Sequence, residues 1–249
     1  MPRTAREKSK SGIYHIMLRG INRQQIFEDE QDNLKFIDIL RDYKTISGYK
    51  VFAYCLMGNH IHLLMKFEGE PIEQAMKRII GRFAYWYNVK YRRTGHLFQD
   101  RFKSEPVDDE AYFLSCIRYI HQNPVKAKIC AINKYLYSSY NAYICDDGDD
   151  LIDADFLFNL ISREQYVDFN AQIVNVPVAD ISEKPVVRIT DDEAKKIIYR
   201  ITKCKNISEF QSLDNKLKPK FLCKLKESGL GVRQISRLTG ESYYIVQKS

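Results

Sequence analysis

Apolar residues in the first half of the chain recur in patterns that predict a regular order of strands and helices. Short apolar and β-branched runs predict strands at residues 12–20, 49–57 and 60–67, with a fourth within 96–107. Apolar positions at helical spacing predict helices at residues 29–47, 72–91 and 108–124. Only Gly58 and Asn59 separate the second and third strands, which favours an antiparallel hairpin. Because this order is that of a split βαβ unit, we predict an α+β, ferredoxin-like antiparallel sheet with helices on one face.

The charge pattern divides the chain into three segments. The net charge is +8 over residues 1–145, −7 over residues 146–189 and +6 over residues 190–249. We therefore predict a main domain, an acidic connector and a small C-terminal domain that is all helical. The two basic segments are typical of polyanion binders, although lysine-rich solvated helix faces would give the same charges.

The end of the chain has the spacing of a helix-turn-helix. Ile235 and Leu238 precede Gly240, and Tyr244 begins a second apolar group that continues through residues 245–246. This spacing predicts two short helices joined by a turn, which is typical of DNA-binding domains. A helical hairpin that packs on the main domain fits the same pattern.

The composition narrows the class of protein. No apolar run approaches the roughly 18 residues of a membrane helix. The N-terminus lacks the apolar centre of a signal peptide, so we expect a cytoplasmic, nucleoid-associated protein without a membrane partner. Six cysteines occur without a CxxC pair, which fits reduced thiols and argues against a zinc finger or a disulfide scaffold.

Two histidines stand out in the third predicted strand. His60 and His62 are two positions apart, so their imidazoles emerge on the same side. Burying both neutral rings requires partners for four ring nitrogens, and a divalent ion would occupy one on each ring. Asn123 could supply a third ligand through its amide oxygen, and Tyr119 shares its helix face at i,i+4. Alternatively, Asn123 caps the helix ahead of Pro124, and Tyr119 is one of seventeen tyrosines without a special role.

Four segments carry a family resemblance. The motifs MGNHIHLL (57–64) and IRYIHQNPVKA (117–127) together resemble the single-tyrosine HUH transposases, most closely the REP-associated tyrosine transposases of the IS200-like superfamily. IYHIMLRGINRQQIF (13–27) and RRTGHLFQDRFKS (92–104) are similar to the first strand and the pre-catalytic loop of that group. The resemblance covers residues 10–145 and is specific because the motifs occur in the group's order.

The resemblance implies a ferredoxin-like nuclease that cleaves and joins single-stranded DNA, often at hairpin-forming repeats. By position, Tyr119 would be the nucleophile, His60 and His62 catalytic metal ligands, and Asn123 the third ligand of a Mg²⁺ or Mn²⁺ ion. Attack by the phenol would leave a 5′-phosphotyrosine and a free 3′-OH. The alternative function is a catalytically inactive or domesticated DNA-binding regulator of repeats or transcription.

Basic residues near the first and fourth strands and in the C-terminal domain are candidate phosphate contacts: Arg19, Arg23, Arg101, Lys103, Arg233 and Arg237. Each is equally well explained as a surface charge. Duplex DNA is a candidate partner of the C-terminal domain. The sequence leaves open whether the active form is a monomer or a homodimer, and whether Tyr119 serves the site of its own chain.

Overall fold

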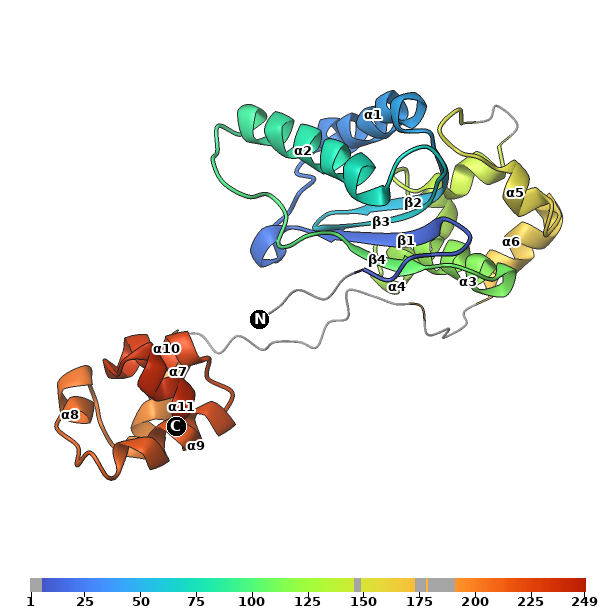
Figure 1. The fold of residues 1–249 in the computed structure, drawn as a ribbon. Coiled ribbons are helices and arrows are strands. Elements are labelled where there is room, and N and C mark those ends of the chain that lie inside the picture. The colour runs from blue at the N-terminus through green and yellow to red at the C-terminus, as the bar shows by residue number, and fades with distance from the viewer. Residues whose placement is uncertain (1–5, 146–148, 173–177, 179–190) are drawn as a thin grey trace. The chain divides into compact units, whose positions relative to one another are not determined.

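The computed structural model describes residues 6–145, 149–172, 178 and 191–249, without the side chains of Asp192 and Arg233. The chain divides into two compact units, Met1–Ser182 and Glu183–Ser249 (Figure 1). No helix among the described residues combines the length and the apolar character needed to cross a membrane.

The first unit is built on a four-stranded antiparallel sheet. Its strands are β1 (Ile13–Arg19), β2 (Tyr49–Met57), β3 (His60–Phe67) and β4 (Lys103–Pro106), in the order β2-β3-β1-β4. Each strand lies within the residues assigned to it from the sequence, and the helices intervene in the predicted order. The predicted ferredoxin-like fold is therefore confirmed.

Two long helices cover one face of the sheet. They are α1 (Glu30–Ser47) and α2 (Ile72–Lys90) (Figure 1). α1 begins with a capping box in which Asp29 and Asp32 each accept a backbone N–H of the other, as an acidic helix start favours. The rings of Phe36 and Phe83 meet edge to face with centroids 5.1 Å apart, which joins the two helices above the sheet.

Helices also cover the second face of the sheet, whereas the sequence predicted helices on one face only. The helical segments after β4 are α3 (Glu110–His121), α4 (Asn123–Lys126), two 3-10 turns (Ile132–Lys134 and Ser139–Tyr143), α5 (Asp155–Phe158) and α6 (Arg163–Ala171). Figure 1 shows α3 on the side of the sheet opposite α1 and α2. The apolar strand residues buried against this layer are Ile13, Phe52, Ala53, Cys55, Met57 and Leu64. A sheet with two apolar faces needs cover on both, which explains the second layer.

Proline divides the predicted helix 108–124. α3 ends at His121, and α4 begins at Asn123 after one intervening residue. Pro124 has no N–H, so it cannot donate to the carbonyl of Ile120 as a continuous helix requires. The sequence therefore located the break correctly, but the chain resumes a helical turn beyond it.

Part of the predicted acidic connector belongs to the first unit. Residues 149–172 pack against it and bury apolar side chains fully in its core: Leu151, Leu157 and Tyr166. Acidic residues of this segment pair with α1, as Asp150 does with Arg41 at 2.7 Å. Its negative charge thus meets basic side chains on α1. Apart from Val178, the rest of residues 146–189 lies outside the described part of the chain.

The second unit is a small helical domain. Its described helices are α7 (Asp191–Thr202), α8 (Ile207–Gln211), α9 (Lys218–Glu227), α10 (Val232–Thr239) and α11 (Tyr243–Lys248). Gly240 ends α10 at φ 75°, and a Cβ there would lie 2.8 Å from a methyl of Ile207, so the turn requires glycine. Val246 of α11 enters the core, whereas Tyr244 and Ile245 are exposed. Two short helices therefore join at the predicted turn.

Candidate active site

The sheet register brings three histidines to the face that α3 covers. Residues directly opposite each other on neighbouring strands share a face. His60 lies opposite Arg19, and His62 lies opposite Met17. His15 is two residues before Met17 on β1 and therefore points the same way. The rings of His60 and His62 emerge side by side, with centroids 5.2 Å apart.

His15 is a member of this site that sequence reasoning missed. Its Nε2 lies 3.1 Å from Nδ1 of His62, and both residues are fully buried. The two rings stack with centroids 5.3 Å apart. A histidine inside an apolar first strand was the available signal. Its partner is 47 positions away, however, and no local pattern reveals which strands pair.

α3 carries Tyr119 onto these histidines. Asp109 caps the start of the helix, because its side chain accepts the backbone N–H of Tyr112 at 2.7 Å. The Tyr119 ring meets His62 and His15 edge to face, with centroids 5.5 and 5.8 Å apart. On α4, the ammonium of Lys126 lies 4.3 Å from the centre of the Tyr119 ring. The structure thus places the predicted nucleophile, one predicted ligand and a cation in one cluster.

Asn123 lies one helical turn after Tyr119, and its amide nitrogen contacts the helix. Nδ2 donates to the carbonyls of Tyr119 at 2.9 Å and Ile120 at 3.4 Å. The second contact replaces the donor that Pro124 lacks. Because the nitrogen is used in this way, Oδ1 is the end of the amide that could coordinate a cation. The capping and ligand interpretations of Asn123 are therefore compatible.

The far side of α3 is anchored by later parts of the first unit. His121 is fully buried, with Nε2 2.8 Å from the hydroxyl of Ser139 and Nδ1 2.9 Å from that of Tyr166. Burial lowers the pKa of His121 to about 3, so the ring is neutral. Gln122 donates to the carbonyl of Asn170 at 2.8 Å. The position of the tyrosine helix therefore depends on α6 and on the 3-10 turn Ser139–Tyr143.

His62 has the properties of a metal ligand. Burial, followed by the neighbouring His15, His60 and Lys126, lowers the pKa of His62 well below its usual value, so the ring is in the neutral form that binds metals. Its Nε2 is buried and has no hydrogen-bond partner among the described residues. Such an atom is costly unless another group occupies it, and a divalent ion would do so.

The ligand set of such an ion must include a side chain other than His, Cys, Asp or Glu. Within the described ranges, no three His, Cys, Asp or Glu side chains form a cluster that could hold a metal ion. His60 and His62 would therefore need an amide to complete a three-residue set. Asn123 uses Nδ2 for the helix carbonyls, so its Oδ1 is chemically suited to that place.

Two predicted DNA contacts share the face of the histidines. Arg19 is half-buried directly opposite His60, and Lys103 is exposed opposite Met17. Arg23 lies farther from the sheet, exposed at the end of the short 3-10 turn Ile21–Arg23.

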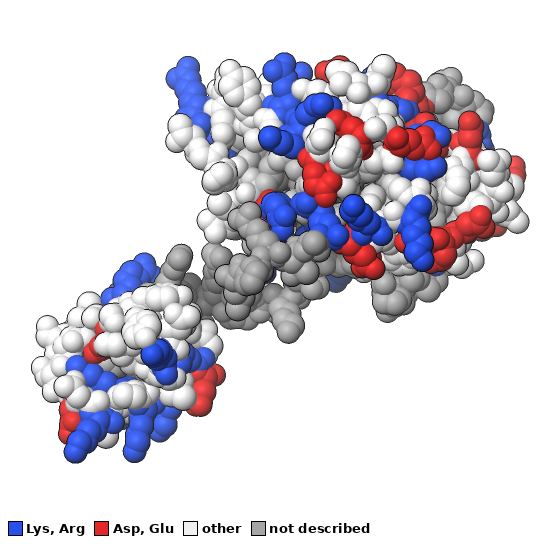
Figure 2. All heavy atoms as spheres, in the orientation of Figure 1, with Lys and Arg blue, Asp and Glu red and all other residues white. Residues whose placement is uncertain are grey.

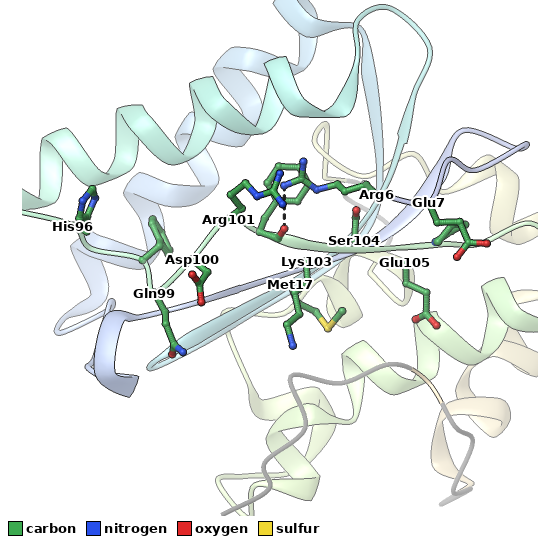
Figure 3. Close-up of a pocket in the computed structure, with 13 residues that line it drawn as sticks. Arg6, Glu7, Met17, His96, Gln99, Asp100, Arg101, Lys103, Ser104 and Glu105 are labelled. Carbon is green, nitrogen blue, oxygen red and sulfur yellow. Dashed lines mark hydrogen bonds between the residues drawn. The ribbon is translucent and has the colours of Figure 1, made fainter. Parts of the chain in front are cut away.

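An open pocket of about 830 Å³ surrounds the edge strand β4. Figure 3 shows Lys103 and Glu105 pointing to one side of the strand, and Arg6 and the exposed Arg101 to the other. The guanidinium of Arg6 stacks on the ring of Phe102 at 3.8 Å. Figure 2 shows Lys and Arg side chains gathered over the middle of the first unit, with Asp and Glu among them. Positive charge therefore flanks both sides of the strand that lies beside the site.

The two predicted contacts of the second unit lie on α10. Arg237 donates to Asp191 at 2.7 Å while remaining exposed. The side chain of Arg233 lies outside the described part of the structure.

Comparisons with known proteins find a family model and two solved structures that are similar to this chain. Residues 8–123 match the family model of IS200-like transposases. The chain is similar to the structure of a REP-associated tyrosine transposase bound to a REP hairpin, with 14% identity and a TM-score of 0.51, over 61% of this chain and 90% of that one. A putative transposase from Deinococcus radiodurans R1 is 20% identical over 52% of this chain and 100% of that one, with a TM-score of 0.35. No curated protein matches the sequence. The match to the IS200-like transposase family model therefore spans residues 8–123, and this segment contains both histidines of the motif, Tyr119 and Asn123.

Proposed function

We propose that this protein is a metal-dependent endonuclease and strand transferase for single-stranded DNA, which acts through a 5′-phosphotyrosine at Tyr119. One observation carries the proposal: the Tyr119 ring contacts His62, whose buried Nε2 has no hydrogen-bond partner among the described residues. A protein that only binds DNA needs neither group. The combination fits a nucleophile beside a metal ligand.

The reaction exchanges one phosphodiester for another. The phenol oxygen of Tyr119 attacks phosphorus, a new oxygen–phosphorus bond forms, and the bond from phosphorus to the 3′ oxygen breaks. The phenol loses a proton and the departing 3′ oxygen gains one. Since the phosphotyrosine retains the energy of the broken diester, a 3′-OH can reverse the step and join strands. The ammonium of Lys126 beside the ring stabilises the negative charge of the attacking group.

His60, His62 and Asn123 would hold a Mg²⁺ or Mn²⁺ ion through two imidazole nitrogens and an amide oxygen. When bound, the ion polarises the scissile phosphate and orients it for in-line attack. The anchoring of α3 through His121 holds Tyr119 at the histidines of its own chain. We therefore propose that the site operates in cis.

The proposed substrate is a single strand next to a hairpin. A REP hairpin is present in the REP-associated transposase structure, and this chain shares that fold. Arg19 and Lys103 would bind phosphates at the histidine face, while Arg23 and Arg101 would bind the strand farther out. In the second unit, Arg233 and Arg237 on α10 would contact duplex DNA.

The test is a search for a covalent adduct. The protein is incubated with Mg²⁺ or Mn²⁺ and single-stranded oligonucleotides taken from both flanks of its own gene, and adducts are resolved on a denaturing gel. We expect an adduct whose peptide mass maps to Tyr119. Tyr119→Phe should abolish it while retaining the fold, because only a hydroxyl is lost.

Tyr112→Phe is the matched control. This tyrosine lies two turns earlier on α3 and should leave the adduct unchanged. An adduct that persists in Tyr119→Phe, or that maps to another tyrosine, would contradict the assigned nucleophile. Tight DNA binding without any adduct would instead favour the alternative function, a DNA-binding regulator that does not cleave.

A further inference from the structure

Glu105, His15 and His62 form a line of neighbouring polar groups on the face of the sheet that α3 covers. The carboxylate Oε2 of Glu105 is 4.0 Å from Nδ1 of His15. On the other side of that ring, Nε2 is 3.1 Å from Nδ1 of His62. The last atom of the line is the buried Nε2 of His62, which has no hydrogen-bond partner among the described residues.

The bond between the two histidines can form in two ways. A neutral imidazole carries one N–H and one lone pair, so only one of the two rings donates. If His15 donates, Nδ1 of His62 accepts and the proton of His62 sits on Nε2, where it blocks coordination. If His62 donates from Nδ1, its Nε2 carries the lone pair that a metal requires.

The carboxylate of Glu105 lies 4.0 Å from Nδ1 of His15, beyond hydrogen-bond distance, so it acts on these two arrangements through its charge. A negative oxygen beside Nδ1 of His15 favours the tautomer with its proton on that nitrogen. Nε2 of His15 is then an acceptor, so His62 must donate from Nδ1. Its Nε2 is consequently left with the lone pair.

We propose that Glu105 and His15 are positioning residues that set the tautomer of His62, so that Nε2 of His62 is ready to coordinate a divalent cation. The proposal rests on the proposed function, because it supplies the reason for His62 to be a ligand. Glu105 and His15 both lie outside the motif of His60 and His62, and the proposed function gives them no role.

The sheet holds the line in place. Glu105 and His15 are paired directly opposite each other on β4 and β1. His15 is fully buried, so water does not compete for its ring, whereas a third of the Glu105 side chain is exposed. Glu105 points to the same side of β4 as Lys103 (Figure 3). A carboxylate on the edge strand therefore reaches the buried pair from the rim of the site.

The test measures the tautomer of His62 directly in the metal-free chain of residues 1–249. With ¹⁵N-labelled histidine, long-range proton–nitrogen correlation spectra distinguish a protonated ring nitrogen from one with a lone pair. The chain has five histidines, so the spectrum is small. We expect His62 to carry its proton on Nδ1. In His15→Phe, which keeps an aromatic ring but removes the acceptor, that preference should be lost.

Glu105→Leu is a second variant, which leaves the buried pair intact and should also shift the tautomer of His62. His121→Gln is the matched control. It also alters a fully buried histidine, but one bonded to Ser139 and Tyr166, so the proton of His62 should stay on Nδ1 as in the wild type. Binding of Mn²⁺, measured by electron paramagnetic resonance, should weaken roughly 10- to 100-fold in His15→Phe and Glu105→Leu.

A wild-type His62 with its proton on Nε2 would overturn the proposal, as would a tautomer that neither variant shifts. Wild-type protein with the Nδ1 proton but no Mn²⁺ binding would support the positioning role and contradict the metal site of the proposed function. The two ideas can therefore fail separately.

Discussion

The buried histidine at the end of the tyrosine helix should make the stability of the first unit depend on pH. His121 is fully buried, and its pKa is about 3, against 6.5 in an exposed state. Above pH 6.5 the ring is neutral in both the folded and unfolded chains, so it adds no pH dependence. As the pH falls below 6.5, the unfolded chain takes up a proton that the folded chain does not bind. Stability is therefore lost between pH 6.5 and about 3.

The size of the stability loss follows from how far the pH falls below the pKa of His121 in the unfolded chain. Each unit of pH below the unfolded pKa costs about 1.4 kcal/mol for one proton. Between pH 7 and pH 5, His121 alone should thus lower the free energy of unfolding by about 2 kcal/mol. His121→Gln removes this contribution. At pH 7 the substitution should destabilise by about 1–3 kcal/mol, because the hydroxyls of Ser139 and Tyr166 lose their ring partner.

Urea unfolding of the wild type and His121→Gln at pH 7 and pH 5 measures the effect. From pH 7 to pH 5 the wild type should lose about 2 kcal/mol of stability more than His121→Gln does. Tyr166→Phe is the control, because it removes a hydrogen bond of His121 but keeps the ring buried, so the pH dependence of the wild type should remain. A difference between the wild type and His121→Gln that is equal at both pH values would refute the reasoning.

Three further predictions concern the site and the limits of the domains. His60→Ala should abolish adduct formation with metal present while leaving oligonucleotide binding by fluorescence anisotropy within a few-fold of the wild type, and undiminished cleavage would rule out the assigned ligand. A chain ending at residue 145 should lose roughly 5 kcal/mol or more of stability in urea, because it lacks the buried Leu151, Leu157 and Tyr166, whereas one ending at residue 182 should unfold like the first unit of the full chain. Removing residues 183–249 should weaken DNA binding and reduce the slope of log affinity against log salt, and an unchanged slope would show that the second unit makes no phosphate contacts.

Local patterns in the sequence predict most of the elements. All four strands lie inside their predicted ranges, because apolar alternation and turn residues act over a few positions. The pair His60 and His62, and the helix position of Tyr119 before Asn123, were visible for the same reason. Pro124 marked the break in its helix, since a missing N–H is a local property.

The acidic segment shows where a local pattern misleads. A run of carboxylates and glycine is typical of a solvated connector, and the sequence alone favoured that interpretation. Asp150 instead pairs with Arg41, which lies 109 positions earlier. The apolar residues between the charges complete the core of the first unit. Charge along the chain does not reveal whether a basic partner is present across the fold.

The sequence by itself determined the order of elements, the histidine pair and the helix that bears Tyr119, because backbone sterics and side-chain periodicity operate between neighbours. Only the tertiary structure decided that a second helical layer covers the sheet, that His15 bonds to His62, and that Glu105 lies opposite His15. These facts depend on strand register and on which apolar faces are buried together. Both are settled by the free energy of contacts between residues far apart in the chain, to which no short stretch of sequence is sensitive.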